Sequence, residues 1–233
     1  CAIPMIRGKY RSRKIEDIVD EAKQLAENGV RELILIAQDT SRYGVDLCGE
    51  QSLDKLLEEL VKIDGVKWIR VHYFYPEAVT DKLIDTMAKY DKICSYVDMP
   101  IQHINNEILR RMARRTNRTE ITEKIRKIRE KMPDCTIRTS IIAGFPGETE
   151  EQFNELYDFV KEIRFDRMGV FAYSQEEGTP AAEFDGQIAE EVKQERLDKL
   201  MTLQQRISLE LNKTKIGKVL EVIVEGYDEE SFL

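Results

Sequence analysis

Apolar positions along this chain recur in two patterns. Short continuous runs such as Leu33-Ile34-Leu35-Ile36 are typical of strands that are buried on both faces of a parallel sheet. Apolar residues three or four positions apart are typical of amphipathic helices. The first pattern predicts strands over 30–37, 66–73, 94–101, 136–143, 167–173 and 217–226. The second predicts helices over 14–28, 53–63, 80–90, 105–115, 118–131, 150–163 and 189–212.

Strands and helices alternate, and each connection between successive strands is long enough for a right-handed parallel crossover. Two helix starts carry the residues of a capping box, Asn117 with Glu120 and Thr149 with Gln152. A doubly wound sheet and a barrel both fit this order of elements. Because the first element is a helix, we expect an α/β fold of the open, partial (β/α)6 TIM-like barrel type that lacks its first strand.

Composition indicates a folded, soluble protein, because 42% of the 233 residues are hydrophobic and 34% are charged. The net charge of −8 argues against a protein that coats nucleic acid. Basic residues gather in 7–14 and 110–118, which are either solvated helix ends or the lining of an anionic ligand site. No apolar run approaches the roughly 18 residues of a membrane span, and no segment resembles a signal peptide. The scattered cysteines predict a reducing, cytoplasmic location, and the lack of a long apolar run predicts no membrane partner.

Polar, glycine and proline residues follow the predicted strands, at the edge where β/α barrels carry their active sites. The most specific segment is Gly144-Phe145-Pro146-Gly147-Glu148, in which glycine lets a ligand approach the backbone. It lacks the pattern of a phosphate loop, and a strand-to-helix turn that needs glycine is the alternative. The scarcity of histidine and the lack of a lysine at a strand end disfavour zinc hydrolases and Schiff-base aldolases. His103 taken alone is more often a structural residue than a catalyst.

The chain begins with Cys1, which opens the run Cys1-Ala2-Ile3-Pro4 ahead of a basic stretch. This run is similar to the end of a Cys-x-x-x-Cys-x-x-Cys loop. Such a loop binds a four-iron cluster through three thiolates and leaves one iron open to another ligand. The alternative is an ordinary cysteine, so the remaining segments must decide between the two.

Taken together, these segments resemble the radical SAM methylthiotransferases. The resemblance rests on Cys1 to Arg13, Ile36 to Gly44, Met99 to Arg115, Arg138 to Glu148, and Phe165 to Pro180. It covers residues 1–212, which would form the radical SAM core barrel. Residues 213–233 resemble the start of a small β domain of the TRAM type.

The resemblance implies S-adenosyl-L-methionine (SAM) and two 4Fe-4S clusters in the full-length protein, with Cys1 as a ligand of one cluster. It also implies a set of SAM-binding residues and assigns no catalytic side chain. These are Gln38, Gln102 and Arg138 at the methionine or ribose part of SAM, Gly144 and Glu148 in the wall of the site, and Phe171 and Tyr173 near the adenine.

Within the family, Ala2-Ile3-Pro4 and Gln102-His103 resemble the branch that adds a methylthio group to the β-carbon of an aspartate in a small-subunit ribosomal protein, the S-twelve protein. The negative net charge favours an encounter with a basic ribosomal protein. The implied partners are this substrate, an external electron donor and a sulfur source. A tRNA methylthiotransferase of the same family and a non-catalytic ligand-binding barrel remain alternatives. As a core fragment, the chain is expected to be inactive by itself.

Overall fold

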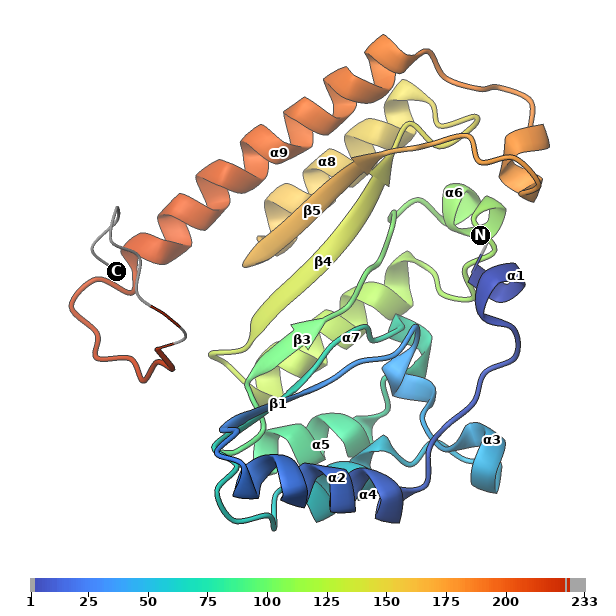
Figure 1. Cartoon of the computed structure of the whole chain (residues 1–233). Coiled ribbons are helices and arrows are strands. Elements are labelled where there is room, and N and C mark those ends of the chain that lie inside the picture. Colours follow the sequence, from blue (N-terminus) through green and yellow to red (C-terminus); the bar gives the residue numbers. More distant parts are fainter. Residues whose placement is uncertain (1–2, 225, 227–233) are drawn as a thin grey trace.

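The computed structural model describes residues 3–224 and 226, and its strands form a curved parallel wall (Figure 1). The strands are β1 (Glu32–Leu35), β2 (Trp68–Val71), β3 (Tyr96–Asp98), β4 (Thr136–Ala143) and β5 (Arg167–Ala172). β1 pairs with β2, and β3, β4 and β5 pair in that order. A bridge between Ile69 and Ile93 joins the two groups. This is the open α/β barrel wall that the sequence predicts.

Helices lie around the wall (Figure 1), and the longer ones pack their apolar faces onto it. They are α1 (Ile3–Arg7), α2 (Ile15–Glu27), α3 (Val45–Cys48), α4 (Leu53–Leu60), α5 (Asp81–Lys89), α6 (Asn106–Arg111), α7 (Arg118–Lys131), α8 (Glu150–Ile163) and α9 (Glu190–Lys213). Single 3-10 turns occur at η1 (Thr40–Arg42), η2 (Pro76–Ala78) and η3 (Pro180–Glu183). Both predicted capping boxes are confirmed, at the starts of α7 and α8. None of the helices in the described part of the chain is long and apolar enough to cross a membrane.

β4 shows how the strands divide their side chains between two faces. Ile137, Thr139, Ile141 and Ala143 are buried on the outer face, under the helices. The alternate residues, among them Arg138 and Ser140, are only half-buried and point to the inner face of the barrel. Because successive side chains of a strand point to opposite sides, this one alternation separates a packing face from a face available to ligands.

Several elements are shorter than predicted, and for β3 and α6 the structure shows a local reason. The ladder of β3 stops at Asp98 because Pro100 has no N–H to donate. Beyond it the side-chain hydroxyl of Thr139 bonds to the backbone of Ile101 and Met99, at 3.2 and 2.9 Å. α6 ends at Arg111, because Ala113 adopts a left-handed backbone with φ of 56° that cannot continue the helix.

The strand predicted over 217–226 is not found within the described residues, and that prediction is wrong for 218–224. These residues have no regular secondary structure, and Val219 and Val222 are exposed. A strand forms only where a second strand satisfies its N–H and C=O groups, and this segment contacts the barrel instead through an ion pair between Glu221 and Lys67 (2.8 Å). Residues 225 and 227–233 lie outside the described residues, so the predicted TRAM-like domain stays a prediction.

Candidate cofactor site

The ends of the central strands bring several predicted site residues to one edge of the wall. Gly144 directly follows β4, and the backbone N–H of Tyr173 donates to the carbonyl of Ala143 (2.9 Å). Gln102 forms a bridge with Ile141 near the same end of β4. Gln102, Gly144 and Tyr173 therefore lie at neighbouring strand ends, as the sequence analysis requires of residues that share a ligand.

Gln102 has a backbone conformation that residues other than glycine rarely adopt. Its φ is 68°, in the left-handed region. Two hydrogen bonds to β4 hold it there, because its N–H donates to the carbonyl of Ser140 and its carbonyl accepts from the N–H of Ile142, each at 2.9 Å. Strained residues fixed in this way concentrate at functional sites. The structure thus supplies a conformational argument for Gln102 that the sequence did not contain.

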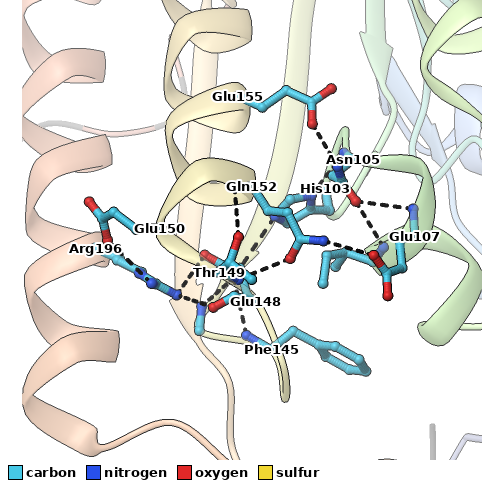
Figure 2. A network of polar contacts seen from close by, with 12 residues as sticks. His103, Asn105, Glu107, Phe145, Glu148, Thr149, Glu150, Gln152, Glu155 and Arg196 are labelled. Carbon is cyan, nitrogen blue, oxygen red and sulfur yellow. Dashed lines mark hydrogen bonds and ion pairs between the residues drawn. The ribbon is translucent and has the colours of Figure 1, made fainter. Parts of the chain in front are cut away.

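The loop after β4 is built around the buried carboxylate of Glu148 (Figure 2). Its Oε2 accepts hydrogen bonds from the backbone N–H groups of Gly144 (2.7 Å) and Phe145 (3.2 Å). Nη1 of Arg196, on α9, donates to its Oε1 at 3.1 Å and to its backbone carbonyl at 3.0 Å. Burial raises the pKa of Glu148, against the opposing effects of Arg196 and the two N–H groups. Glu148 therefore shapes the wall from behind the loop.

The glycines of this loop are required by the protein's own side chains. Gly144 has φ of 73°, and a Cβ there would collide with the buried side chain of Lys193 from α9. Gly147 has φ of 80°, a conformation that favours glycine, and a Cβ there would displace the guanidinium at the flexible end of Arg111. The alternative reading of this motif, a turn that needs glycine for its geometry, is thus sufficient to explain both residues. Access for a ligand at Gly144 stays a prediction.

His103 is fully buried beside the same carboxylate. Its Nδ1 accepts a hydrogen bond from the backbone N–H of Asn105 (3.0 Å), which places the proton of the neutral ring on Nε2. That Nε2 has no hydrogen-bond partner among the described residues and lies 3.9 Å from Oε2 of Glu148. Burial lowers the pKa of His103 to about 4. The ring is therefore neutral at physiological pH, and its role is to pack in the interior, the structural role that the sequence favoured.

The two predicted adenine-side aromatic residues differ in their availability to a ligand. Tyr173 is buried against Phe145, with ring centroids 5.3 Å apart, and Nζ of Lys193 lies 5.3 Å from its ring. Phe171 pairs with Ile142 in the register of β4 and β5 and is 57% exposed. Gln38 follows β1 and is also exposed. Phe171 and Gln38 are therefore free to contact a ligand, while Tyr173 forms part of the packing behind the loop.

Arg138 lies away from this edge. It is six residues before Gly144, or roughly 20 Å along the extended strand. Its Nη1 donates to Oδ1 of Asp98 (2.7 Å), whose Oδ2 is 3.0 Å from Nδ1 of His72. Burial opposes the charge of Arg138, but the hydrogen bond and charge of Asp98 outweigh it and raise the pKa of Arg138. The sequence analysis missed Asp98 and His72, although polar residues at every second position of their strands were a signal.

Cys1, the predicted cluster ligand, lies outside the described residues. Two of the remaining cysteines, Cys94 and Cys135, are withdrawn from solvent and do not replace it. Burial raises the pKa of Cys135 to about 12 and also raises that of Cys94, so both thiols stay protonated and unsuited to metal binding. Across residues 3–224, no cluster of three or more His, Cys, Asp or Glu side chains could hold a metal ion. The described residues therefore do not form a cluster site.

The fold is an open α/β barrel with an ordered loop after β4 at its carboxyl edge. Residues 1–160 match the family model of the radical SAM superfamily. The chain belongs to that superfamily, which implies SAM and a 4Fe-4S cluster as cofactors.

Solved structures agree with this assignment at the level of the fold. Coproporphyrinogen III oxidase HemN from Escherichia coli, a radical SAM enzyme, matches with a TM-score of 0.63 at 17% identity. The match covers 85% of this chain and 47% of the HemN chain. Methylornithine synthase PylB has a TM-score of 0.57 at 15% identity and covers 88% of this chain and 58% of its own. At these identities the likeness shows the shared barrel only.

Curated relatives are much more similar in sequence. Ribosomal protein uS12 methylthiotransferase RimO of Clostridioides difficile is 59% identical over 231 residues, which are 99% of this chain and 52% of that protein. The protein of the same name from Clostridium perfringens is 54% identical over 233 residues, which are 100% of this chain and 52% of that protein. These relatives confirm the resemblance to radical SAM methylthiotransferases. The chain spans about half the length of the curated relatives it matches.

Replacing Glu148 by alanine should destabilise the fold strongly. The change leaves two buried backbone N–H groups without an acceptor and removes the buried carboxylate that pairs with Arg196, which keeps only the carbonyl of residue 148 and the exposed carboxylate of Glu150. We therefore expect the free energy of unfolding to fall by about 3–5 kcal/mol. Urea denaturation of the full-length protein, followed by circular dichroism, measures it. Glu150→Ala is the control, because its carboxylate is 59% exposed and should contribute at most about 1 kcal/mol. Equal losses in the two variants would contradict the structural role of Glu148.

Acidification should destabilise the protein through His103. Its pKa in the folded state, about 4, lies below its ordinary value, so the unfolded chain takes up a proton first as the pH falls from about 6.5. The raised pKa of Glu148 acts in the opposite direction and offsets part of this loss. Between pH 7.5 and pH 5.0 we expect the wild type to lose roughly 1–2 kcal/mol more of unfolding free energy than His103→Asn, which keeps an acceptor but does not titrate. Parallel pH profiles for the two proteins would show that His103 is not the titrating group.

Proposed function

We propose that this chain is the SAM-binding barrel of a radical SAM methylthiotransferase that modifies an aspartate of ribosomal protein uS12. The observation that carries the proposal is identity of 52–59% across essentially the whole chain to proteins named for that activity. The curated relatives are about twice as long, so the activity belongs to a full-length protein of which this chain is one part.

The SAM site in this proposal lies at the carboxyl edge of β1 and β3–β5. Gln38 and Gln102 would contact the methionine or ribose part, the backbone at Gly144 would form a wall, and Phe171 would cover the adenine. Glu148 and Tyr173 would support this wall from its far side without contacting SAM, because other parts of the protein bury both side chains. Fixed positions of this kind let the barrel orient SAM and exclude water from it, while the cofactor carries the chemistry.

The remaining assignments concern parts of the protein that the described residues do not include. We assign Cys1 as one of three thiolate ligands of a 4Fe-4S cluster that supplies the electron for SAM cleavage. A second cluster, an external electron donor and a sulfur source complete the reaction, which takes place in the cytoplasm. Residues 213–233 would begin a TRAM-like domain.

The substrate is tested by mass spectrometry of ribosomes and tRNA from a strain that lacks the full-length gene. We expect uS12 to lose a methylthio adduct on one aspartate and to regain it when the gene is restored. The methylthio nucleosides of tRNA serve as the control, because their level should be unchanged in the same strain. Loss of a methylthio-adenosine from tRNA, with uS12 unchanged, would overturn the proposal and favour the tRNA branch.

The SAM site is tested by Gln102→Ala in the full-length protein. Removal of a hydrogen-bonding group at the ligand should lower the affinity for SAM about tenfold, the effect of one polar contact of roughly 1.5 kcal/mol. Isothermal titration calorimetry measures the affinity, and circular dichroism confirms the fold. Gln194→Ala on the outer face of α9 is the matched control. An unchanged affinity in Gln102→Ala would show that the site has been misplaced.

A further inference from the structure

Segment 110–115, part of a basic stretch noted in the sequence, has no role in the proposed SAM site. Four of its six residues are arginines and none is acidic. No ion pair joins any of these arginines to a carboxylate within the described part of the chain. The next helix, α7, differs, because its basic residues pair with carboxylates at four positions: Arg118, Arg126, Lys127 and Lys131. The charge of the segment is therefore left for a ligand outside the chain.

A tight turn at the end of α6 fixes the backbone of this segment. Ala113 has the left-handed conformation, and its N–H donates to the carbonyl of Arg110 (3.0 Å). The N–H of Arg114 donates to the carbonyl of Leu109 (2.9 Å). These are the two hydrogen bonds of a Schellman motif. The negative end of the helix dipole accounts for Arg110 and Arg111, which lie in the last turn, but not for the two arginines that follow the turn.

Two of the guanidinium groups lie over aromatic rings at the carboxyl edge of the barrel. Cζ of Arg114 is 4.6 Å from the ring centroid of Tyr75, which follows β2. Cζ of Arg111 is 5.3 Å from that of Phe184, which follows β5. Nη2 of Arg111 also donates to the carbonyl of Asp185 (3.4 Å), and α6 lies on the same side of the barrel as η3 (Figure 1). The segment therefore contacts connections that follow β2 and β5, at the edge where SAM is placed.

The N–H donors of this segment remain available to an anionic ligand. Arg110 and Arg115 are exposed, and neither side chain forms a hydrogen bond to a residue that the structure describes. Glu107, one turn earlier in α6, accepts instead from Nε2 of Gln152 (3.1 Å). A guanidinium presents its donors in one plane, which matches the oxygens of a phosphate or carboxylate. The result is a positive edge on a chain whose net charge is −8.

The charge of this edge opposes the entry of a basic protein by itself. Like charges brought together at an interface disfavour association, and a ribosomal protein is basic. In the small ribosomal subunit the same protein is surrounded by ribosomal RNA, which carries a negative charge at every nucleotide. Arginine binds such phosphates well. An acidic protein would also match the charge, but the substrate must reach SAM at this edge, so the particle that carries the substrate is favoured.

We infer that segment 110–115 binds the phosphate backbone of ribosomal RNA, so that the enzyme recognises uS12 within the small ribosomal subunit in preference to free uS12. The inference rests on the proposed function, since it names the form in which that substrate is bound. Arg110, Arg114 and Arg115 would contact phosphates, whereas Arg111 is held against the connections after β4 and β5. Contacts to the phosphate backbone carry no sequence information and serve to position the bound particle.

The test measures how tightly the full-length protein, with SAM present, binds free uS12 and small ribosomal subunits from a strain that lacks the gene. Thermophoresis of the labelled enzyme gives both affinities over a range of potassium chloride concentrations. For the wild type at low salt we expect the subunit to bind at least about tenfold more tightly than free uS12, because only the subunit offers phosphates. In the double variant Arg110→Gln/Arg115→Gln, subunit binding should weaken at least about fivefold. The slope of log K against log salt should become shallower by about 1.5, the effect of two lost phosphate contacts. The affinity for free uS12 should not fall.

The matched control is Arg126→Gln/Lys131→Gln on α7, which removes the same charge from side chains that pair with carboxylates of this chain. It should keep the wild-type affinity for the subunit and the wild-type salt slope. All four side chains are exposed, so circular dichroism should show both double variants to be folded.

Equal affinity of the wild type for the subunit and for free uS12 would overturn the inference. A double variant at 110 and 115 whose subunit affinity and salt slope match those of the control would do the same, as would tighter binding of purified tRNA than of the subunit. If uS12 carries the modification in cells while that variant behaves like the control, only this inference fails. If uS12 is never modified, the proposed function fails and the inference with it.

Discussion

The buried carboxylate of Glu148 is the interaction on which the carboxyl edge of this barrel depends (Figure 2). It accepts hydrogen bonds from the backbone N–H groups of Gly144 and Phe145 and from the guanidinium of Arg196. A carboxylate that is removed from water must keep such partners, because an uncompensated buried charge costs several kcal/mol. The loop after β4, the start of α8 and the N-terminal part of α9 are therefore fixed relative to one another by one group.

This constraint explains why α9 belongs to the site although it follows the last strand. Arg196 and Lys193 reach from α9 to the back of the loop, and Lys193 occupies the space that a side chain at Gly144 would need. The wall that would face SAM is thus shaped by contacts on its far side. His103 completes the packing as a neutral ring, because the interior favours its uncharged form.

The inner face of the barrel follows different physics from the outer face. Outward positions of the strands are apolar and pack against helices, whereas inward positions pair opposite charges across neighbouring strands. The exception is Arg167, which stands next to Arg138 without a carboxylate among the described residues.

The sequence by itself determined the five strands, seven of the helices and both capping boxes, because apolar periodicity and helix caps depend on residues close together in the chain. It also placed Gln102 and Gly144 at strand ends, since carboxyl ends of parallel strands share one edge. Only the tertiary structure decided the partners: Arg196 lies 48 residues from Glu148, and Asp98 lies 40 residues from Arg138. It also showed that side chains from α9 and α6 occupy the space next to the glycines of the loop. The apolar segment 218–224 has no strand partner among the described residues. Pairings of this kind join residues that are far apart in the sequence. No local pattern of side chains shows which of them the fold brings into contact.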